Sequence, residues 1–524
     1  MVRLLRWALR NSLRRYHDCL RDPRAAQESV LQGLLRQSAD TAFGRAHDLS
    51  AVKSLEDFRS AVPIRPHSEL QPWLARVAEG EAGVLTRSPV RQLLETSGTT
   101  GASKLLPVTD EWATSVQEAQ ALWTLGLLQE VPGVRKGSIL SVVSPSQHAT
   151  SVGGLPIGSN TGRIRQAQPD WMRKRYAVPD EVVQISDPVA RQYAILRCAL
   201  QASVTSWTTA NPSMILLLCR RLTEWQESLA EDLHNGTLRC GPAASLSQEV
   251  RGMVEPRLKR ATPPTCWEPA SIWPLQAVNC WTQGPASYFA ARLQDVLGRP
   301  IPIRDVGLRA SEGFFAFPVR HDDPGSVLWT GGHLLEFVGD DGQARWAWEL
   351  EPGERARMVV STQAGLLRYD LADEVQVVGR CGQVPLVRFV GKYGRYLNCM
   401  GEKVTAAQVS VAMGAAAEAV GEHPVGFCVR IRLDEVPAYV VALEGVQDVG
   451  ATTAAFDEAL SVSNVEYASK RESGRLAPPE PLLLPAGALA RYREGRARDG
   501  APEGQVKDPI IAVDEETWQR VVGP

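Results

Sequence analysis

Residues 95–107 read Glu-Thr-Ser-Gly-Thr-Thr-Gly-Ala-Ser-Lys-Leu-Leu-Pro. Two glycines lie three positions apart among hydroxyl residues, and Lys104 follows three positions after the second glycine. A short, partly apolar run precedes this segment at residues 91–94, and the sequence has a helical pattern from Thr109. Glycines let backbone N–H groups face a phosphate, hydroxyl groups add donors, and a lysine adds a point charge. A strand, a flexible loop and a helix therefore predict an anion site.

The spacing of this loop differs from the Walker motif, in which Gly-Lys-Ser/Thr follows the first glycine after four residues. For the glycines alone, an ordinary turn between strand and helix is the alternative interpretation. The order of hydroxyls, glycines and lysine is more specific than either glycine. The candidate nucleotide-binding residues of the loop are Thr96, Ser97, Gly98, Thr99, Thr100, Gly101 and Lys104.

The segment resembles the phosphate loop of adenylate-forming enzymes, which activate carboxylic acids with ATP. Residues 105–107, Leu-Leu-Pro, narrow the resemblance to the Gretchen Hagen three family of auxin-responsive acyl acid amido synthetases. That family is known from plants and also occurs in bacteria, and this chain looks like a bacterial-type member. The resemblance extends from near the N-terminus to about residue 412, and it returns in patches near the end.

Composition excludes several other classes of protein. The 524 residues carry a net charge of −2 and a pI near 6.5, which gives no general attraction to nucleic acid or to anionic membranes. No apolar run approaches the roughly 18 residues that cross a bilayer. Nine scattered cysteines without a C-x-x-C pair favour reduced thiols and a cytoplasmic location, and eight histidines form no H-x-x-x-H pair. We therefore expect no metal held by protein ligands alone.

The first fifteen residues alternate arginines with leucines and a tryptophan. This pattern fits an amphipathic first helix whose arginines lie along the surface, and we prefer that reading to a transit peptide or a membrane-surface helix. Residues 41–45 and 58–64 resemble family landmarks that follow an opening helical segment, which supports the same interpretation.

Strand-like and helix-like segments then alternate. Residues 138–143 read as a buried strand, and residues 188–203 and 212–229 as helices. From about 325 to 390, short strands separated by glycine and aspartate indicate a small antiparallel sheet or barrel. Residues 405–420 read as a helix, and residues 426–431 and 439–443 as strands.

We therefore expect an α/β protein with two domains. Residues 1–394 form a large N-terminal adenylate-forming domain with open sheets plus a small β-barrel-like subdomain. Residues 395–524 form a smaller, mobile α/β C-terminal cap domain, and the glycine-bearing residues 391–395 are the candidate hinge.

Residues 308–313, Leu-Arg-Ala-Ser-Glu-Gly, are the second candidate site segment. The resembling family carries an aromatic residue followed by Ala-Ser-Ser-Glu here, and its glutamate is implied to hold Mg²⁺ on the phosphates. Glu312 matches that glutamate, and Ser311 joins the nucleotide site. A carboxylate is a ligand that Mg²⁺ prefers. Leu308 replaces the aromatic residue, which puts adenine stacking there in doubt.

Residues 365–373 are the third segment, and they resemble the family pattern Gly-Leu-Tyr-Arg-Tyr-x-x-Gly-Asp. Asp373 matches the aspartate that is implied to accept hydrogen bonds from both ribose hydroxyls, and Tyr369 would flank the base. Ala372 replaces the usual glycine. That change is mild in an extended backbone and serious where φ must be positive.

Residues 504–509 resemble the family's Gln-Tyr-Lys-x-Pro. Lys507 matches the lysine that is implied to neutralise charge between the carboxylate and the α-phosphate, so it is a candidate catalytic residue together with Glu312. By spacing alone, such a lysine would be read as solvated surface. Val506 replaces the aromatic residue of the pattern.

Further residues are assigned less specifically. Asn464, Tyr467 and Arg471 resemble a pattern of the C-terminal domain and are read as structural or acceptor-side residues. The candidates for the acid pocket are residues 144–162, Trp123, Asn279, Trp281 and Tyr288, although aromatic residues at such spacing more often belong to a core.

The resemblance implies an ATP-dependent ligase that forms a carbon–nitrogen bond through an acyl-adenylate. Its substrates would be ATP with Mg²⁺, a small-molecule carboxylic acid, and an amine such as an amino acid. Three alternatives stay open at this point. The chain could pass the acyl group to coenzyme A or a carrier thiol, it could be a lapsed paralogue that binds nucleotide without turnover, or, least favoured, it could be a phosphoryl-transfer kinase. The sequence identifies neither acid nor amine, nor the oligomeric state.

Overall fold

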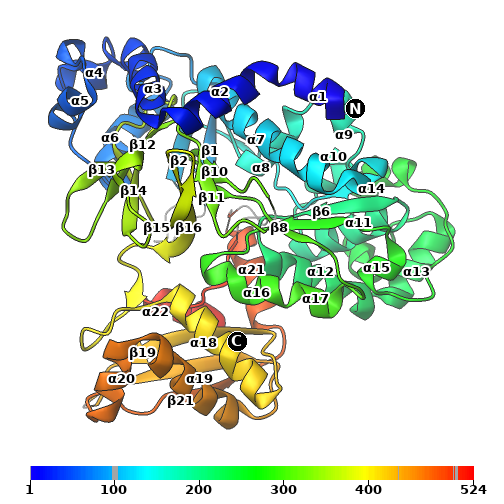
Figure 1. The fold of residues 1–524 in the computed structure, drawn as a ribbon. Helices are drawn as coiled ribbons and strands as arrows, with labels where there is room; N and C mark the ends of the chain where they lie inside the picture. Colours follow the sequence, from blue (N-terminus) through cyan, green and yellow to red (C-terminus); the bar gives the residue numbers. More distant parts are fainter. Residues whose placement is uncertain are drawn as a thin grey trace.

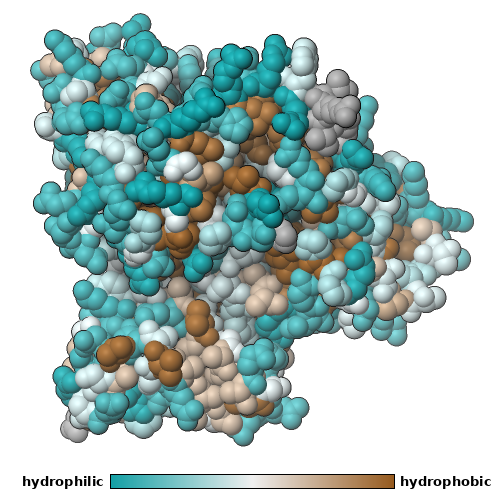
Figure 2. Space-filling view, viewed as in Figure 1, coloured by the Kyte–Doolittle hydropathy of each residue, from teal (hydrophilic) through white to brown (hydrophobic). Residues whose placement is uncertain are grey.

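The computed structural model describes residues 2–96, 104–320, 322–434, 436–499, 501 and 506–523, and of residues 2–4 and 96 it describes the backbone only. Figure 1 shows a large N-terminal part above a smaller C-terminal part, which begins near residue 396. In the view of Figure 2 the outline narrows where the two parts meet.

Helices form the beginning of the chain. They are α1 (Val2–Ala8), α2 (Arg10–Arg21), α3 (Pro23–Ser38), α4 (Ala42–Ala46), α5 (Leu55–Ala61) and α6 (His67–Ala78). Helix α3 starts at a proline after Asp22, whose side chain accepts a hydrogen bond from the Ala25 N–H. Its leucines and Val30 are buried at helical spacing. Among the described residues, no helix is long and apolar enough to cross a membrane.

The strands on either side of residues 97–103 pair with each other as a β-hairpin. Strands β1 (Gln92–Thr96) and β2 (Lys104–Val108) pair antiparallel, with Thr96 opposite Lys104. Strands β5 (Pro156–Gly158) and β4 (Ala149–Thr150) complete the sheet in the order β2-β1-β5-β4. The predicted strand, loop and helix order is therefore corrected, because a second strand separates the loop from α7 (Asp110–Glu130). The loop does not open directly onto a helix N-terminus.

A separate parallel sheet has the strand order β3-β6-β7-β8. Its strands are β3 (Ser138–Leu140), β6 (Val204–Thr208), β7 (Ala277–Cys280) and β8 (Ile303–Asp305). Helices α8 (Asn160–Gln166), α9 (Asp170–Arg173), α10 (Asp180–Val183), α11 (Pro188–Leu200), α12 (Pro212–Glu224), α13 (Gln226–Asn235), α14 (Gln248–Val254), α15 (Pro269–Ile272), α16 (Ser287–Ala291) and α17 (Leu293–Val296) connect or surround these strands. The helix predicted over residues 212–229 divides at Trp225 into α12 and α13.

The predicted small β subdomain is an antiparallel sheet in the order β13-β12-β14-β15-β16-β11-β10-β9. The strands are β9 (Leu308–Ala310), β10 (Gly313–Phe317), β11 (Ser326–Leu328), β12 (Leu334–Val338), β13 (Ala344–Trp346), β14 (Arg355–Ser361), β15 (Tyr369–Cys381) and β16 (Val384–Lys392). The sheet begins earlier than residue 325, because β9 and β10 join it. Glu312 therefore belongs to the same sheet as Asp373.

The C-terminal part is a second α/β unit. Its strands are β17 (Tyr396–Leu397), β18 (Val404–Thr405), β19 (Gly426–Arg432), β20 (Ala438–Glu444) and β21 (Glu480–Leu484). Its helices are α18 (Ala406–Val420), α19 (Val449–Ser463), α20 (Val465–Glu472), α21 (Ala488–Arg498) and α22 (Glu515–Val522). Strands β19, β20 and β21 form one sheet, and β19 and β20 correspond to the strands predicted over residues 426–431 and 439–443. In Figure 1, α21 lies on the side that faces α12 and α16.

Candidate active site

The β1–β2 hairpin positions Lys104, the last candidate of the glycine-rich loop. Residues 97–103, which include Ser97, Gly98, Thr99, Thr100 and Gly101, lie outside the described residues, as does the Thr96 side chain. Lys104 is half-buried at the start of β2. Loss of hydration lowers the pKa of its ammonium, and the nearby Glu312 carboxylate opposes that shift in part. Lys104 and Glu312 therefore lie within electrostatic range of each other.

Ser311 and Glu312 form the tight turn between β9 and β10, because Ala310 pairs directly with Gly313. The Glu312 side chain is 9% exposed. Burial raises the pKa of this carboxyl, while Lys392 and Lys104 act in the opposite direction. The indole N–H of Trp112, on α7, donates a 2.6 Å hydrogen bond to the Glu312 carbonyl. The turn is thus fixed by sheet pairing on one side and by a helix on the other.

Asp373 lies opposite Lys392 in the pairing of β15 with β16. The Lys392 ammonium is 2.6 Å from the Asp373 carboxylate and donates a 3.1 Å hydrogen bond to the Leu371 carbonyl. Burial lowers the pKa of Lys392, but the ion pair with Asp373 outweighs it and raises the pKa overall. Lys392 therefore keeps its positive charge at neutral pH, beside a buried acid.

Tyr369 is 1% exposed and begins β15. Its hydroxyl forms a hydrogen bond with the Glu312 side chain, and burial together with the Glu312 charge raises the pKa of the phenol. The ring also meets His67 edge-on, with ring centres 6.3 Å apart. Tyr369 thus orients the predicted metal-binding carboxylate, a contact that the sequence did not predict.

The neighbouring residues explain how the Asp373 segment is held. The Arg368 guanidinium donates two hydrogen bonds of 2.9 Å to the buried Glu336 carboxylate and further ones to the Arg59 and Val62 carbonyls. Ala372, which replaces the family's glycine, adopts a φ of +53°. This is the left-handed region that favours glycine. An alanine at this position is therefore under backbone strain, the more serious of the two cases expected from the sequence.

Lys507 comes from the C-terminal part and lies over two aromatic rings. Its ammonium is 4.6 Å from the ring centre of Trp281, which follows β7, and 5.9 Å from that of Phe389 on β16. Surrounding protein lowers the pKa of Lys507 through loss of hydration, although the side chain keeps access to solvent. Asp373 is the carboxylate that opposes this shift. The lysine therefore lies within electrostatic range of Asp373.

The described candidates thus meet in one place. The charges of Glu312 and Asp373 act on the pKa of Lys104, and those of Asp373 and Lys392 act on the pKa of Lys507. Lys104, Lys392 and Asp373 in turn act on the pKa of Glu312. Three lysines and two buried carboxylates give this group an excess of positive charge. A site with that balance suits a polyphosphate whose sugar and metal are bound by acids.

A cavity of about 100 Å³ lies between α7 and the ends of β3 and β6. Its lining includes Trp123, Leu127, Met172 and Tyr176. Several polar residues also line it, namely Gln120, Thr124, Ser141, Gln168, Arg175, Ser206 and Thr208. Trp123 therefore lines a cavity, and its place in the acid pocket stays a prediction. Asn279 instead lies inside the sheet, where its amide donates to Ser206 and Thr208.

Tyr288 does not line this cavity. Its hydroxyl donates a 2.8 Å hydrogen bond to the Pro424 carbonyl, and its ring packs edge-on against Phe427. Tyr288 therefore belongs to the contact between α16 and the C-terminal part.

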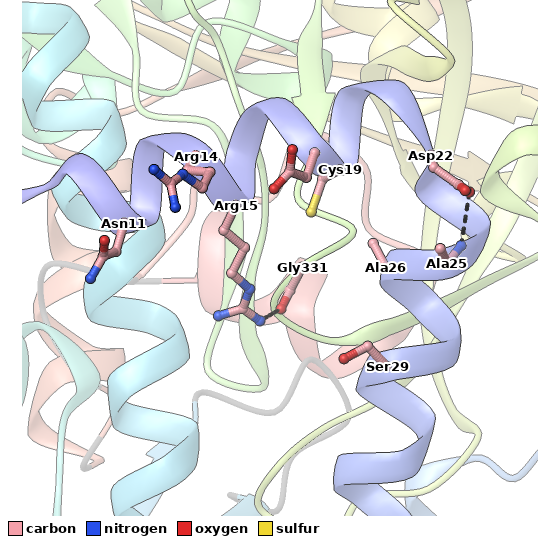
Figure 3. A pocket seen from close by; sticks show the side chains of 10 residues that line it. Asn11, Arg14, Arg15, Cys19, Asp22, Ala25, Ala26, Ser29 and Gly331 are labelled. Atoms are coloured by element: carbon pink, nitrogen blue, oxygen red, sulfur yellow. Dashed lines mark hydrogen bonds between the residues drawn. The ribbon is translucent and has the colours of Figure 1, made fainter.

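A larger surface cavity of about 420 Å³ lies between α2, α3 and Gly331, and its lining includes none of the described candidate residues (Figure 3). Arg15 already donates to the Gly331 carbonyl there and pairs with Glu118. No cluster of three or more His, Cys, Asp or Glu side chains with metal-site geometry occurs within the described part of the chain.

Two residues of the site were not predicted. Lys392 was seen only as part of a hinge, because the strand pairing that places it beside Asp373 is invisible in the sequence. His67, the first residue of α6, lies near Lys104, and burial together with that charge lowers its pKa to about 4. Its imidazole is therefore neutral at pH 7.

The pattern residues of the C-terminal part form an internal brace. Asn464 caps α20, Tyr467 donates to Asp457, and the Arg471 guanidinium donates hydrogen bonds to both oxygens of the same aspartate. Each of these bonds lies within the C-terminal part. This favours the structural reading of these residues.

Comparisons with known proteins all match this chain to members of one family. The chain matches the GH3 family N-terminal domain over residues 12–303, the central domain over 327–392 and the C-terminal domain over 407–516. It is 24% identical over 451 residues to indole-3-acetic acid-amido synthetase GH3.2 of Arabidopsis thaliana, covering 79% of this chain and 82% of that protein. It is 25% identical over 465 residues to jasmonoyl--L-amino acid synthetase JAR6 of Nicotiana attenuata, covering 81% and 79%.

Among solved structures, GH3.15 acyl acid amido synthetase superposes with a TM-score of 0.84 at 18% identity, covering 97% of this chain and 95% of that one. The predicted α/β fold with a large N-terminal and a smaller C-terminal domain is thereby confirmed. The three matched domains span most of the sequence, and the chain belongs to the GH3 family.

Proposed function

We propose that this chain is an ATP-dependent acyl acid amido synthetase, a ligase that forms a carbon–nitrogen bond through an acyl-adenylate. One observation carries the proposal: Lys104, Glu312, Asp373 and Lys507 come from four distant parts of the sequence and meet in one charged site. A surface turn or a solvated lysine would not produce this convergence.

In the first step, a carboxylate oxygen of the acid attacks the α-phosphorus of ATP, and pyrophosphate leaves. Two anions have to approach each other, so cations at the reacting centre lower the barrier. Lys507 would neutralise charge between the carboxylate and the α-phosphate. Lys104, with the loop that precedes it, would bind the outer phosphates, and Asp373 would accept hydrogen bonds from the ribose hydroxyls.

Glu312 is the residue that would hold Mg²⁺. Its side chain is one buried carboxylate near lysines, and a nucleotide-bound Mg²⁺ takes one or two protein carboxylates with waters and phosphate oxygens. The donor set therefore fits the ion. When bound, Mg²⁺ would screen the phosphate charges. The Tyr369 hydroxyl would keep the Glu312 carboxylate oriented.

In the second step, an amine attacks the acyl carbon, the amide bond forms, and AMP leaves. We propose an amino acid as the acceptor. We also propose that residues 1–394 and 395–524 act as two domains, and that the cap turns about residues 391–395 between the steps. Closure would exclude water, which otherwise hydrolyses the mixed anhydride. The nine free thiols fit the cytoplasmic location that we propose.

The acid would place its apolar end in the cavity beside Trp123. That cavity lies at the carboxyl ends of β3 and β6, where ligands bind in open parallel sheets. Trp123 donates from its indole to the Asp305 carbonyl, so the ring is fixed in orientation.

The proposal is tested by acid-dependent exchange of pyrophosphate into ATP. Aryl, indolyl, fatty and polyketide acids are supplied one at a time, with and without mixed amino acids, and products are weighed by mass spectrometry. We expect exchange with one acid class and an amide product. Glu312→Gln, which removes the metal-binding charge and keeps the shape, should abolish exchange.

Two other outcomes would replace the proposal. A thioester in place of an amide, when thiols and amines compete, would indicate transfer to coenzyme A or a carrier. Absence of exchange across the whole panel would indicate a lapsed, nucleotide-binding paralogue.

A further inference from the structure

The residue before Lys507 is tied to the N-terminal part. The Val506 side chain is 4% exposed, and its carbonyl accepts a 2.6 Å hydrogen bond from the Asn211 side-chain amide. Asn211 directly precedes α12 and is itself buried. A buried side chain of the N-terminal part therefore holds the backbone next to Lys507.

Asn211 is fixed in orientation by its own helix. Its side-chain oxygen accepts hydrogen bonds from the Ser213 N–H at 3.1 Å and from the Ser213 hydroxyl at 3.0 Å. The oxygen thus caps α12. The side-chain N–H₂ is left pointing at Val506, so one residue both begins a helix and donates across to the C-terminal part.

The residues after Lys507 belong to the C-terminal part. Asp508 pairs at 2.5 Å with Arg493 on α21, and both side chains are buried. Beyond it, the Ile510 carbonyl accepts a hydrogen bond from the Val429 N–H on β19, and the Ala512 N–H donates to the Val429 carbonyl. Lys507 therefore lies between Val506, whose carbonyl is bound by the N-terminal part, and Asp508, whose side chain is bound by the C-terminal part.

This arrangement has a mechanical consequence. Any turn of the cap carries β19, and with it residues 508–512, relative to α12. The bond from Asn211 to Val506 then opens, because its donor and acceptor belong to different parts. The ion pair of Asp508 with Arg493 joins two residues of the C-terminal part and stays intact. The hydrogen bond of 3.5 Å that Arg493 donates to the Ser213 hydroxyl on α12 opens together with the bond from Asn211.

We propose that Asn211 is a positioning residue that latches Lys507 in the arrangement that forms the acyl-adenylate, and that this latch opens for the amide-forming step. The inference rests on the proposed function. It assigns to Asn211 a role in one half-reaction only. A buried asparagine that merely caps α12 would affect both half-reactions alike, through stability.

The substitution Asn211→Asp separates the two roles. Aspartate keeps the oxygen that caps α12, but it replaces the donor with a second oxygen that faces the Val506 carbonyl. Asn464→Asp is the matched control. Asn464 also caps a helix, α20, and also donates to a buried carbonyl, that of Glu402 at 2.9 Å, but both groups lie in the C-terminal part.

The half-reactions are measured separately as acid-dependent ATP–pyrophosphate exchange and as amide formation from preformed acyl-adenylate. For Asn211→Asp we expect kcat of exchange to fall about 10-fold or more, because a lost buried donor facing a carbonyl corresponds to that range. KM for ATP and the transfer rate should change less than about 2-fold. Asn464→Asp should lower Tm without changing the ratio of the two rates.

A double mutant shows whether Asn211 acts through Lys507. In a Lys507→Ala background, Asn211→Asp should cause no further loss of exchange, since the group that it positions is absent. Additive losses, a parallel fall of exchange and transfer, or an unchanged exchange rate would each overturn the proposal.

A readout that needs no turnover keeps this inference separate from the proposed function. In the full-length protein without substrates, the rate at which an amine-reactive reagent labels Lys507 is followed by peptide mass spectrometry. Asn211→Asp should raise that rate about 3-fold or more, and Asn464→Asp should leave it unchanged. Failure of exchange in the wild type would refute the proposed function alone. An unchanged labelling rate in Asn211→Asp would refute the latch, and so would a rate that Asn464→Asp raises equally.

Discussion

The acids of the site and its C-terminal lysine are positioned by different means. Glu312 and Asp373 lie in one antiparallel sheet, where strand pairing fixes a tight turn and a cross-strand ion pair with Lys392. Lys507 lies in a segment without regular pairing of its own, and it is held by Asn211 from one part and by Arg493 and β19 from the other. The two acids are therefore positioned by the strands of their own sheet, and Lys507 is positioned by contacts with both parts of the molecule.

This difference divides the two tasks of the proposed enzyme. Nucleotide binding needs a geometry that persists through both half-reactions, and a network of sheet hydrogen bonds provides it. Charge neutralisation at the α-phosphate is needed only during adenylation, so a lysine on a separable segment can be withdrawn afterwards. The comparison predicts that perturbing the sheet residues affects nucleotide handling throughout, and that perturbing the segment affects one step.

Replacing Lys507 with alanine should give the largest effect. The change removes the cation that lies over Trp281, and we expect kcat of ATP–pyrophosphate exchange to fall about 100-fold or more. Transfer from preformed acyl-adenylate should change less than about 3-fold. The control is Lys470→Ala, which removes a lysine that pairs with Glu466 in α20. Equal losses in both half-reactions would contradict the claim that Lys507 acts in adenylation only.

The pH range in which exchange is active should be narrower than ordinary glutamate and lysine pKa values would give, at both its acid and its alkaline end. Burial raises the pKa of Glu312, so the carboxylate needed for Mg²⁺ forms only above its usual range, and the acid limb shifts upward. Loss of hydration lowers the pKa of Lys507, so its ammonium is lost below its usual range, and the alkaline limb shifts downward.

The profile of kcat/KM is measured between about pH 5 and 10, within which both limbs should then appear. In Lys507→Arg, the guanidinium stays charged across this pH range. The alkaline limb of the residual activity should therefore move to higher pH, and the acid limb should stay in place. An alkaline limb that does not move in this variant would assign the limb to another group, such as Lys104.

The smallest effect is expected at Ala372. Its φ of +53° costs an alanine about 1–2 kcal/mol of backbone strain, which a glycine would remove. Glycine also increases the conformational entropy of the unfolded chain, which lowers stability by about 0.5–1 kcal/mol. Ala372→Gly should therefore raise the free energy of unfolding by up to about 1.5 kcal/mol. This appears as a Tm increase of up to about 3 °C. Exchange activity should stay unchanged, because Asp373 keeps its partner Lys392.

The control for this substitution is Ala356→Gly in β14. Ala356 is buried in a strand and is not among the described residues with positive φ, so glycine there should lower Tm. A decrease of Tm in both variants would show that the left-handed backbone at Ala372 carries no recoverable strain.

Local patterns predicted most of the elements. The alanine-rich residues 405–420 indicated a helix, and α18 begins at Ala406 with Thr405 as its cap. The strand, loop and helix order around residue 100 was wrong, because residues 104–108 pair with β1 only in the hairpin. Residues 212–229 divide at Trp225 because both helices bury their apolar faces in the same core, a tertiary effect.

The sequence by itself determined the family, the fold class and the identity of Glu312, Asp373 and Lys507 as candidates, because the residue types and their order in short motifs carry that information. Only the tertiary structure decided that Lys392 pairs with Asp373, that Tyr369 orients Glu312, and that Asn211 holds the backbone beside Lys507. These contacts join residues that are far apart in the chain. Strand register and packing between the two parts create them, and no local pattern encodes either.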